Sequence, residues 1–433
     1  MSTIQNLHAR EILDSRGNPA LEIDLILNTG ETVRAAVPSG ASTGSKEAYE
    51  LRDQDPARLH GKGLKKAIQN VQGELRNAVI GKSVVEQNAI DLAMIQLDGT
   101  ENKQRLGANA ILGISLAVCR AGAIASKQPL YEYIGTRLFK GDVNLLPTPM
   151  FNILNGGVHA DNNVDFQEFM IAPVGASTFR EAVEWAAETY QTLKSILKKQ
   201  GLTSSVGDEG GFAPELKSNE HAIEIILEAI SQAGFQPGKQ IAIALDPAAS
   251  EFYENGMYIF KKSDKSSKNS DQMITFWNSW IRQYPIIMLE DGLAEDDWEG
   301  WFHLTQNLGK KVQLVGDDIF VTNPGIIKKA IQAHIGNASL IKLNQIGTVT
   351  ETIEAMKVSR AAGYHCVISH RSGETTDDFI ADFAVGTRAA QIKTGAPCRG
   401  ERVAKYNQLM RIEEALGKEA KFAGISPFKV THG

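Results

Sequence analysis

The sequence predicts an α/β barrel of the TIM type that follows a smaller N-terminal α+β domain. After residue 150, short apolar runs alternate with segments of helical periodicity, which is typical of a parallel sheet buried on both faces. From Glu290 onward the runs end in ionisable residues that recur at steps of 23 to 28 residues, and one strand–helix unit of a barrel fits that step. A doubly wound sheet gathers its ligands near one switch point and does not need a charged residue on six consecutive strands, so the closed barrel is preferred.

The composition is that of an ordinary globular protein and disfavours several classes of function. The chain has 433 residues, of which 42% are hydrophobic and 22% charged, and its formal net charge is -6. No basic cluster indicates a nucleic-acid partner, and the N-terminus has no apolar signal segment. The apolar stretch Ala108–Ala125 contains polar residues and glycines, so we expect a buried helix and no membrane partner. Three widely spaced cysteines form no disulfide framework, which favours a reducing, cytoplasmic location; they are Cys119, Cys366 and Cys398.

Residues 1–140 are expected to form an α+β capping domain. Three strands in an antiparallel meander should come first, and three helices should follow. Between them lies a loop of small residues, 38–46, which we expect to be mobile. The expected strands are Ile4–Leu13, Ala20–Leu27 and Glu31–Val37, and the expected helices are Gly63–Val79, Val85–Asp98 and Ala108–Ser126.

Residues 145–433 are expected to form the (β/α)8-type barrel, with a boundary at the proline-containing segment Leu145–Pro149. Its beginning is irregular, because Phe151–Asn155 and Phe166–Ala172 are separated only by a turn and should pair as a hairpin. The helices before Ser205 should then come as a pair. Later apolar runs begin at residues 205, 241, 286, 312, 340, 366 and 389, with helices between most of them, such as Asn219–Ala233, Asp271–Tyr284, Asn323–His334 and Thr350–Ala362.

Three carboxylates on successive strand ends predict a metal site. Asp246, Glu290 and Asp317 should converge if their strands are neighbours, and three unpaired carboxylates repel one another unless a cation lies among them. Oxygen ligands without cysteine or histidine favour Mg2+. The alternative is that these acids are helix caps and ion pairs, and that Asp318 and Glu295 are plain surface acids.

Two strand-end lysines face two acids from the early part of the barrel. Lys342 should have a lowered pKa through desolvation, Lys393 and a nearby cation, and a neutral amine can then abstract a proton. Glu168 and Glu209, placed on early strands, supply an acid on the opposite side of a substrate. The alternatives are a lysine that only pairs with an acid, and a plain loop acid at Glu209.

A short anion-binding segment follows a later strand. Arg371 offers a planar fork for phosphate or carboxylate and Ser372 adds a hydroxyl, although the same residues also suit a helix-capping turn. His159, taken alone, is better explained as a structural histidine. Gly40–Gly44 fits the G-x-S-x-G pattern of hydrolases, but no parallel sheet precedes it, so this match is rejected.

Ten motifs together resemble the enolase family, and they run nearly end to end, from Asp14 to Glu414. They are DSRGNPALE (Asp14–Glu22), VPSGASTG (Val37–Gly44), NGGVHADN (Asn155–Asn162), GDEGGFAP (Gly207–Pro214), ALDPAAS (Ala244–Ser250), EDGLAEDDWEGW (Glu290–Trp301), GDDIFVTN (Gly316–Asn323), IKLNQIGT (Ile341–Thr348), SHRSGET (Ser369–Thr375) and IKTGAPCRGERVAKYNQLMRIEE (Ile392–Glu414).

The resemblance implies a ββαα(βα)6 barrel, a homodimer or higher homo-oligomer, and the reversible dehydration of 2-phosphoglycerate to phosphoenolpyruvate in glycolysis. It implies that Lys342 is the base and Glu209 the acid, supported by Glu168. It also implies two Mg2+ ions, the first held by Asp246, Glu290 and Asp317 and the second joined by Ser42 of the mobile loop. The implied substrate-binding residues are His159, Gln167, His370, Arg371, Ser372 and Lys393.

Two other functions compete with this interpretation. A barrel lysine can form a Schiff base, as in metal-independent aldolases, although the acid triad disfavours this. An enolase scaffold can also carry an added surface-binding role, and intact residues at every implied catalytic position argue against a purely structural protein.

Overall fold

The N-terminal part of the chain begins with a three-stranded antiparallel sheet, as the sequence predicts. The computed structural model describes residues 2–428. Strands β1 (Ile4–Leu13), β2 (Pro19–Leu27) and β3 (Thr32–Val37) pair in the order β1-β2-β3. The turn between β2 and β3 contains Gly30, whose positive φ of 97° suits glycine.

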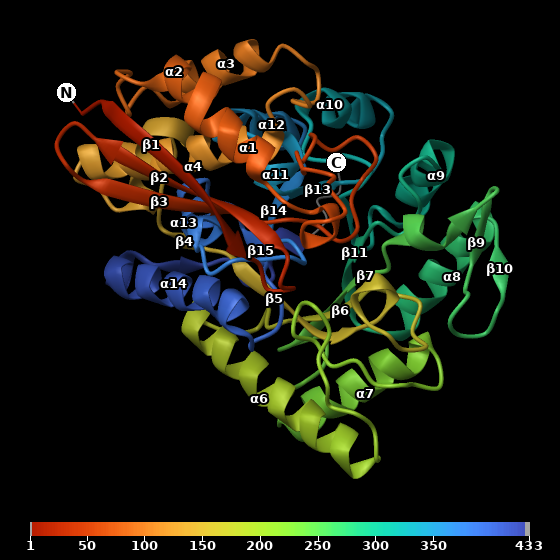
Figure 1. Cartoon of the computed structure of the whole chain (residues 1–433). Helices are drawn as coiled ribbons and strands as arrows, with labels where there is room; N and C mark the ends of the chain where they lie inside the picture. The colour runs from red at the N-terminus through yellow and green to blue at the C-terminus, as the bar shows by residue number, and fades with distance from the viewer. Residues whose placement is uncertain (1, 429–433) are drawn as a thin grey trace.

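Helices cover one side of this sheet (Figure 1). The expected first helix is present as α1 (Lys65–Asn70) and α2 (Arg76–Val79), joined by a π-helical turn, η2 (Val71–Leu75). Helix α3 (Gln87–Asp98) and helix α4 (Ala108–Ala125) follow, then α5 (Leu130–Tyr133) and η3 (Ile134–Phe139). Helix α4 is long and apolar enough to cross a membrane by composition, but 83% of it is buried inside the protein. It packs on β2 and β3, so it is a core helix, as expected.

The second part of the chain is a closed eight-stranded barrel, which confirms the predicted fold class. The strand order is β11-β12-β13-β14-β15-β5-β6-β7. Strands β5 and β6 are antiparallel, and so are β6 and β7, whereas the other pairs are parallel. The hairpin at the start is therefore confirmed. The strands are β5 (Thr148–Asn155), β6 (Glu168–Ala172), β7 (Ala242–Asp246), β11 (Ile286–Glu290), β12 (Gln313–Gly316), β13 (Ala338–Ile341), β14 (His365–Ser369) and β15 (Gln391–Lys393).

Helices surround the barrel and begin at local capping signals. Asn269 caps helix α8 (Ser270–Gln283) and forms a capping box with Gln272. Asn323 caps helix α10 (Pro324–Gln332), which begins with a proline. The helices are α6 (Phe179–Lys199), α7 (Asn219–Gln232), α8 (Ser270–Gln283), α9 (Trp298–Leu308), α10 (Pro324–Gln332), α11 (Leu343–Ile346), α12 (Val349–Ala361), α13 (Phe379–Gly386) and α14 (Gly400–Leu416). Short strands β8 (Tyr253–Glu254), β9 (Met257–Ile259) and β10 (Ser267–Lys268) form a separate small sheet, and β4 (Leu145–Leu146) pairs with β16 (Lys421–Phe422).

One expected barrel run is a loop, and this corrects the sequence analysis. Residues 205–214 lie between α6 and α7 and form only isolated bridges, through Val206, Phe212 and Leu154. The segment is rich in glycine, and Gly210 has a φ of +89°, which breaks an extended strand. The paired helices therefore stand on either side of Ser205 instead of both preceding it.

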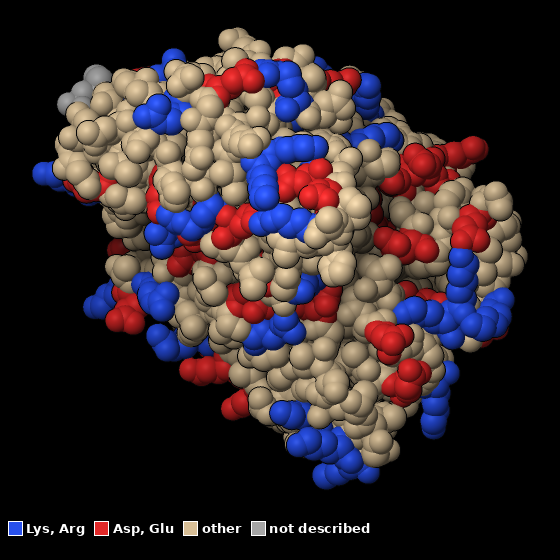
Figure 2. Space-filling model, viewed as in Figure 1, with Lys and Arg blue, Asp and Glu red and all other residues tan. Residues whose placement is uncertain are grey.

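Acidic and basic side chains are interspersed on the face shown in Figure 2. No continuous basic surface covers this face of the described residues, in line with the negative net charge of -6.

Candidate active site

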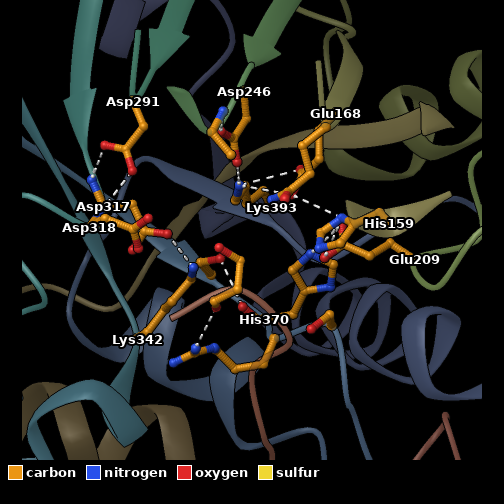
Figure 3. Close-up of a pocket in the computed structure, with 16 residues that line it drawn as sticks. His159, Glu168, Glu209, Asp246, Asp291, Asp317, Asp318, Lys342, His370 and Lys393 are labelled. Atoms are coloured by element: carbon orange, nitrogen blue, oxygen red, sulfur yellow. Dashed lines mark hydrogen bonds and ion pairs between the residues drawn. The ribbon is translucent and has the colours of Figure 1, made fainter. Parts of the chain in front are cut away.

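One pocket, shown in Figure 3, lies at the carboxyl ends of the parallel barrel strands and at the amino end of the antiparallel strand β6. All of the predicted site residues except Glu290 line it. The predicted residues that line the pocket are Ser42, His159, Gln167, Glu168, Glu209, Asp246, Asp317, Lys342, His370, Arg371, Ser372 and Lys393. The lining residues, which also include Asp291 after β11, come from both parts of the chain and from all eight barrel strands or the loops next to them.

Lys393 lies at the centre of the acidic part of the pocket. Its Nζ is 2.7 Å from a carboxylate oxygen of Glu290. It is also 3.1 Å from Asp246 and 3.3 Å from Glu168, as Figure 3 shows. Burial by itself lowers the pKa of Lys393, but these carboxylates outweigh it and hold the pKa well above its usual value. Lys393 is therefore a permanent cation that partly compensates three buried acids.

The three predicted metal ligands, Asp246, Glu290 and Asp317, are buried carboxylates, the donor type that a hard divalent cation prefers. Among the described residues, the three acids that offer oxygens within 4.8 Å of one another are Asp291, Asp317 and Asp318, so only Asp317 of the trio belongs to that group. Glu290 is fully buried behind Lys393, and its Oε2 has no hydrogen-bond partner among the described residues. Burial raises the pKa of Glu290, and the charge of Asp246 raises it further. An orphaned carboxylate oxygen close to other acids is the arrangement that a bound cation relieves. Carboxylate oxygens suit a hard divalent cation better than a soft metal.

Two acids in the pocket were not predicted as site residues. Asp318, a plain surface acid in the alternative interpretation, is buried, and Asp291 binds the backbone beside it. The carboxylate of Asp291 accepts hydrogen bonds from the backbone N–H groups of Asp317 and Asp318, each at 2.9 Å. Asp291, Asp317 and Asp318 each offer one carboxylate oxygen that lies within 4.8 Å of the other two. The signal in the sequence was the doubling of acids at Glu290-Asp291 and Asp317-Asp318.

Lys342 is paired with Asp317, whose other oxygen accepts a hydrogen bond from Gln345 at 2.8 Å. The expectation of a lowered pKa for Lys342 is wrong for the chain by itself. Burial lowers the pKa, but the charge of Asp317 more than offsets this and raises it above the usual value. A cation that takes over Asp317 would remove the group that keeps Lys342 protonated.

Glu168, Glu209 and His159 form a second cluster across the pocket from Lys342 (Figure 3). One donor atom of each lies within 4.8 Å of the others. Glu209 is placed by the loop between α6 and α7, not by an early strand as expected, whereas Glu168 begins β6. Burial raises the pKa of Glu168, and the charge of Glu209 raises it further. Burial raises the pKa of Glu209 too, but the surrounding donors, His370 first, outweigh burial and hold that pKa well below its usual value. In the chain by itself the pair therefore carries its proton on Glu168, and Glu209 is the carboxylate.

The loop 38–46 lies against the anion-binding segment. The guanidinium of Arg371 donates to Glu47 at 2.9 Å and to the carbonyl of Ser42 at 3.3 Å, and the N–H of Ala41 donates to Ser372 Oγ at 2.7 Å. Gly40 makes this approach possible, since a Cβ there would lie 1.9 Å from a guanidinium nitrogen of Arg371.

A barrel that gathers buried acids, lysines and an arginine around one pocket belongs to the class of acid–base enzymes that act on anionic substrates. Residues 4–134 match the family described as "Enolase, N-terminal domain", and residues 143–431 match "Enolase, C-terminal TIM barrel domain". The chain therefore belongs to the enolase family, whose members use a divalent metal. A protein named Enolase 1 from Chlorobaculum tepidum is 54% identical over 426 residues, which cover 98% of this chain and 99% of that protein.

Proposed function

We propose that this chain is a hydro-lyase of the enolase type that interconverts 2-phosphoglycerate with phosphoenolpyruvate and water in glycolysis. The observation that carries the proposal is the placement of Lys342 on one side of a single pocket and of the Glu168–Glu209 pair on the other (Figure 3). Removing a proton from one face of a substrate and protonating a hydroxyl on the other needs a base and an acid in this relation.

Lys342 is the proposed base for the proton on C2. Its side chain is buried at the pocket, and burial favours the neutral amine over the charged one. Once the salt bridge to Asp317 is released, nothing offsets this effect, and the amine can act as a base. In the proposal, the amine then accepts the C2 proton and passes it to solvent later in the cycle.

Glu209 is the proposed acid for the departing C3 hydroxyl, with Glu168 as its partner. Two adjacent carboxyls that favour a single shared proton can deliver it to a leaving group at neutral pH. Arg371 and Ser372 are proposed to bind the phosphate and Lys393 the carboxylate, because they supply the donors of the pocket. His159, Gln167 and His370 are proposed to line the substrate.

We propose two Mg2+ ions per site, one held by Asp246, Glu290 and Asp317 and one joined by Ser42. When bound, they supply positive charge that stabilises the carboxylate as negative charge builds up after loss of the C2 proton. The oxygen-only donor set and the orphaned Oε2 of Glu290 support this assignment.

The remaining features of the proposal rest on family membership and composition. We propose a division into domains at 1–140 and 145–433, a homodimer or larger homo-oligomer, and a cytoplasmic location, which three free cysteines support. A Schiff-base aldolase is not favoured, because the chain belongs to the enolase family and its pocket gathers buried acids suited to a divalent cation.

The test is the absorbance of phosphoenolpyruvate formed from 2-phosphoglycerate, with and without Mg2+. We expect formation that depends on the metal. Absence of product in the presence of Mg2+ would overturn the proposal, and borohydride trapping of substrate on the protein would support the aldolase instead.

Solvent exchange separates the two proton transfers. In D2O, Glu209→Gln should lose net turnover but still exchange the C2 proton, whereas Lys342→Ala should lose both, by about 10²–10⁴-fold. Glu215→Gln, an exposed acid on the same loop, is the matched control and should behave as the parent. Exchange that survives in Lys342→Ala but not in Glu209→Gln would reverse the two roles.

A further inference from the structure

Arg402 is a fully buried arginine beside the pocket that the proposed proton transfers do not use. It lies in the first turn of α14 and its exposed fraction is 0%. A buried guanidinium is costly unless nearby acceptors and charges compensate it. Its Nε lies 3.3 Å from a carboxylate oxygen of Glu401 without a hydrogen bond to it, and its terminal nitrogens donate to the active-site loops.

The terminal nitrogens of Arg402 hold the loops that carry the site residues. They donate to the backbone carbonyls of Arg371 at 2.6 Å, Ser372 at 2.7 Å and Asp208 at 3.1 Å. Asp208 directly precedes Glu209, and the other two carbonyls belong to the anion-binding segment. Gly395 leaves room for this side chain, because a Cβ there would lie 2.7 Å from Arg402 Cδ.

The same guanidinium sets the tautomer of His370. Arg402 Nη1 is 2.6 Å from His370 Nδ1. A guanidinium is always protonated and only donates, so Nδ1 must accept. Burial also lowers the pKa of His370, to about 3, so the ring is neutral and its one proton lies on Nε2.

His370 Nε2 faces Glu209. The distance from Nε2 to Glu209 Oε2 is 3.2 Å, although the N–H is not fully aligned with that oxygen. Asn152 Nδ2 donates to the same oxygen at 2.9 Å. An oxygen approached by two donors is an acceptor, and Glu209 is a carboxylate in the chain by itself. A proton that Glu209 takes up, for example from Glu168, therefore belongs on Oε1, the oxygen 3.7 Å from His159 Nδ1.

We propose that Arg402 is a positioning residue that fixes the Nε2–H tautomer of His370 and thereby places the transferable proton of Glu209 on Oε1. The proposal rests on the proposed function, in which Glu209 protonates the leaving hydroxyl. With the opposite tautomer, Nε2 would be an acceptor and would draw the Glu209 proton onto Oε2, away from the cluster with His159 and Glu168.

The first test observes the tautomer directly and needs no activity. Proton–nitrogen correlation spectra of protein labelled with 15N-histidine report which ring nitrogen carries a proton, and His370→Gln identifies one of the nine histidines by loss of its signals. We expect a bare Nδ1 and a protonated Nε2 in the parent, and a shift toward Nδ1–H in Arg402→Met. A protonated Nδ1 in the parent, or an unchanged tautomer in the variant, would overturn the proposal.

The second test separates a positioning role from a general structural one. With substrate saturating, so that a disturbed anion-binding segment changes KM alone, Arg402→Met should lower net formation of phosphoenolpyruvate at least about tenfold. C2 exchange in D2O should stay within about twofold of the parent, because Arg402 acts through the acid and not through Lys342. An equal loss of exchange and turnover would refute the proposal.

Controls keep this result distinct from the proposed function itself. Arg399→Met, on the same helix start but bonded to Glu401 and the Ser15 carbonyl, should leave the tautomer and both rates unchanged. If Arg402→Met does not fold, the spectrum of the parent still decides the tautomer. A parent that makes no phosphoenolpyruvate would overturn the proposed function and leave the tautomer measurement standing.

Discussion

Removal of the central cation of the pocket should destabilise the protein in a way that a divalent metal reverses. Lys393→Met keeps the length of the side chain but leaves the carboxylates of Glu168, Asp246 and Glu290 without the amine that now lies 2.7 to 3.3 Å from them. The Lys393 side chain is only 2% exposed, so water cannot replace the lost partner.

The expected loss is about 3–5 kcal/mol of unfolding free energy at pH 7 without metal, the usual cost of leaving a buried charge unpaired. With Mg2+, a cation held by Asp246 and Glu290 compensates the same charges, so the difference from the parent should shrink. Lower pH should also shrink it, because burial already raises the pKa of Glu168 and Glu290 and protonation removes their charge.

Urea unfolding with EDTA and with Mg2+, at pH 5.5 and pH 7, measures these differences. Lys405→Met is the matched control, because Lys405 is equally buried but pairs with Glu374 at 2.9 Å, outside the metal-ligand cluster. It should lose stability to the same degree with and without Mg2+. A loss in Lys393→Met that Mg2+ leaves unchanged would refute the assignment of these acids to a metal site.

Three further outcomes are expected. Asp246→Ala should still fold but bind Mg2+ much more weakly, and calorimetric titration showing parental affinity would exclude Asp246 as a ligand. Proteolysis within Ser39–Ser45 should be slower with substrate and Mg2+ than without, and equal rates would argue against a closing loop. Burial raises the pKa of Asp91 to about 6, above its unfolded value, so its ionisation destabilises the fold as pH rises. Between pH 4 and 6.5 the parent should therefore lose up to about 3 kcal/mol relative to Asp91→Asn, and urea curves that stay parallel would contradict this.

The amino-acid sequence alone determined the barrel and most of the pocket. Apolar runs that end in Asp246, Glu290 or Lys393 specify both a buried strand and a functional end, because parallel strands of a barrel all present their carboxyl ends on one face. The hairpin of β5 and β6 followed from a short connection that cannot hold a crossover helix. These are local signals, and local signals are what a sequence displays directly.

The tertiary structure alone decided the partners of each charged group. Whether Lys342 is protonated depends on Asp317. The two residues follow neighbouring barrel strands, and the closed barrel places them close enough to form a salt bridge. Asp318 is buried with its backbone bound by Asp291, and Arg402 reaches His370 because the first turn of α14 lies beside the loop that follows β14. No periodicity encodes such contacts. They depend on how distant elements pack, and the energies of buried charges depend on distances that only the folded chain fixes.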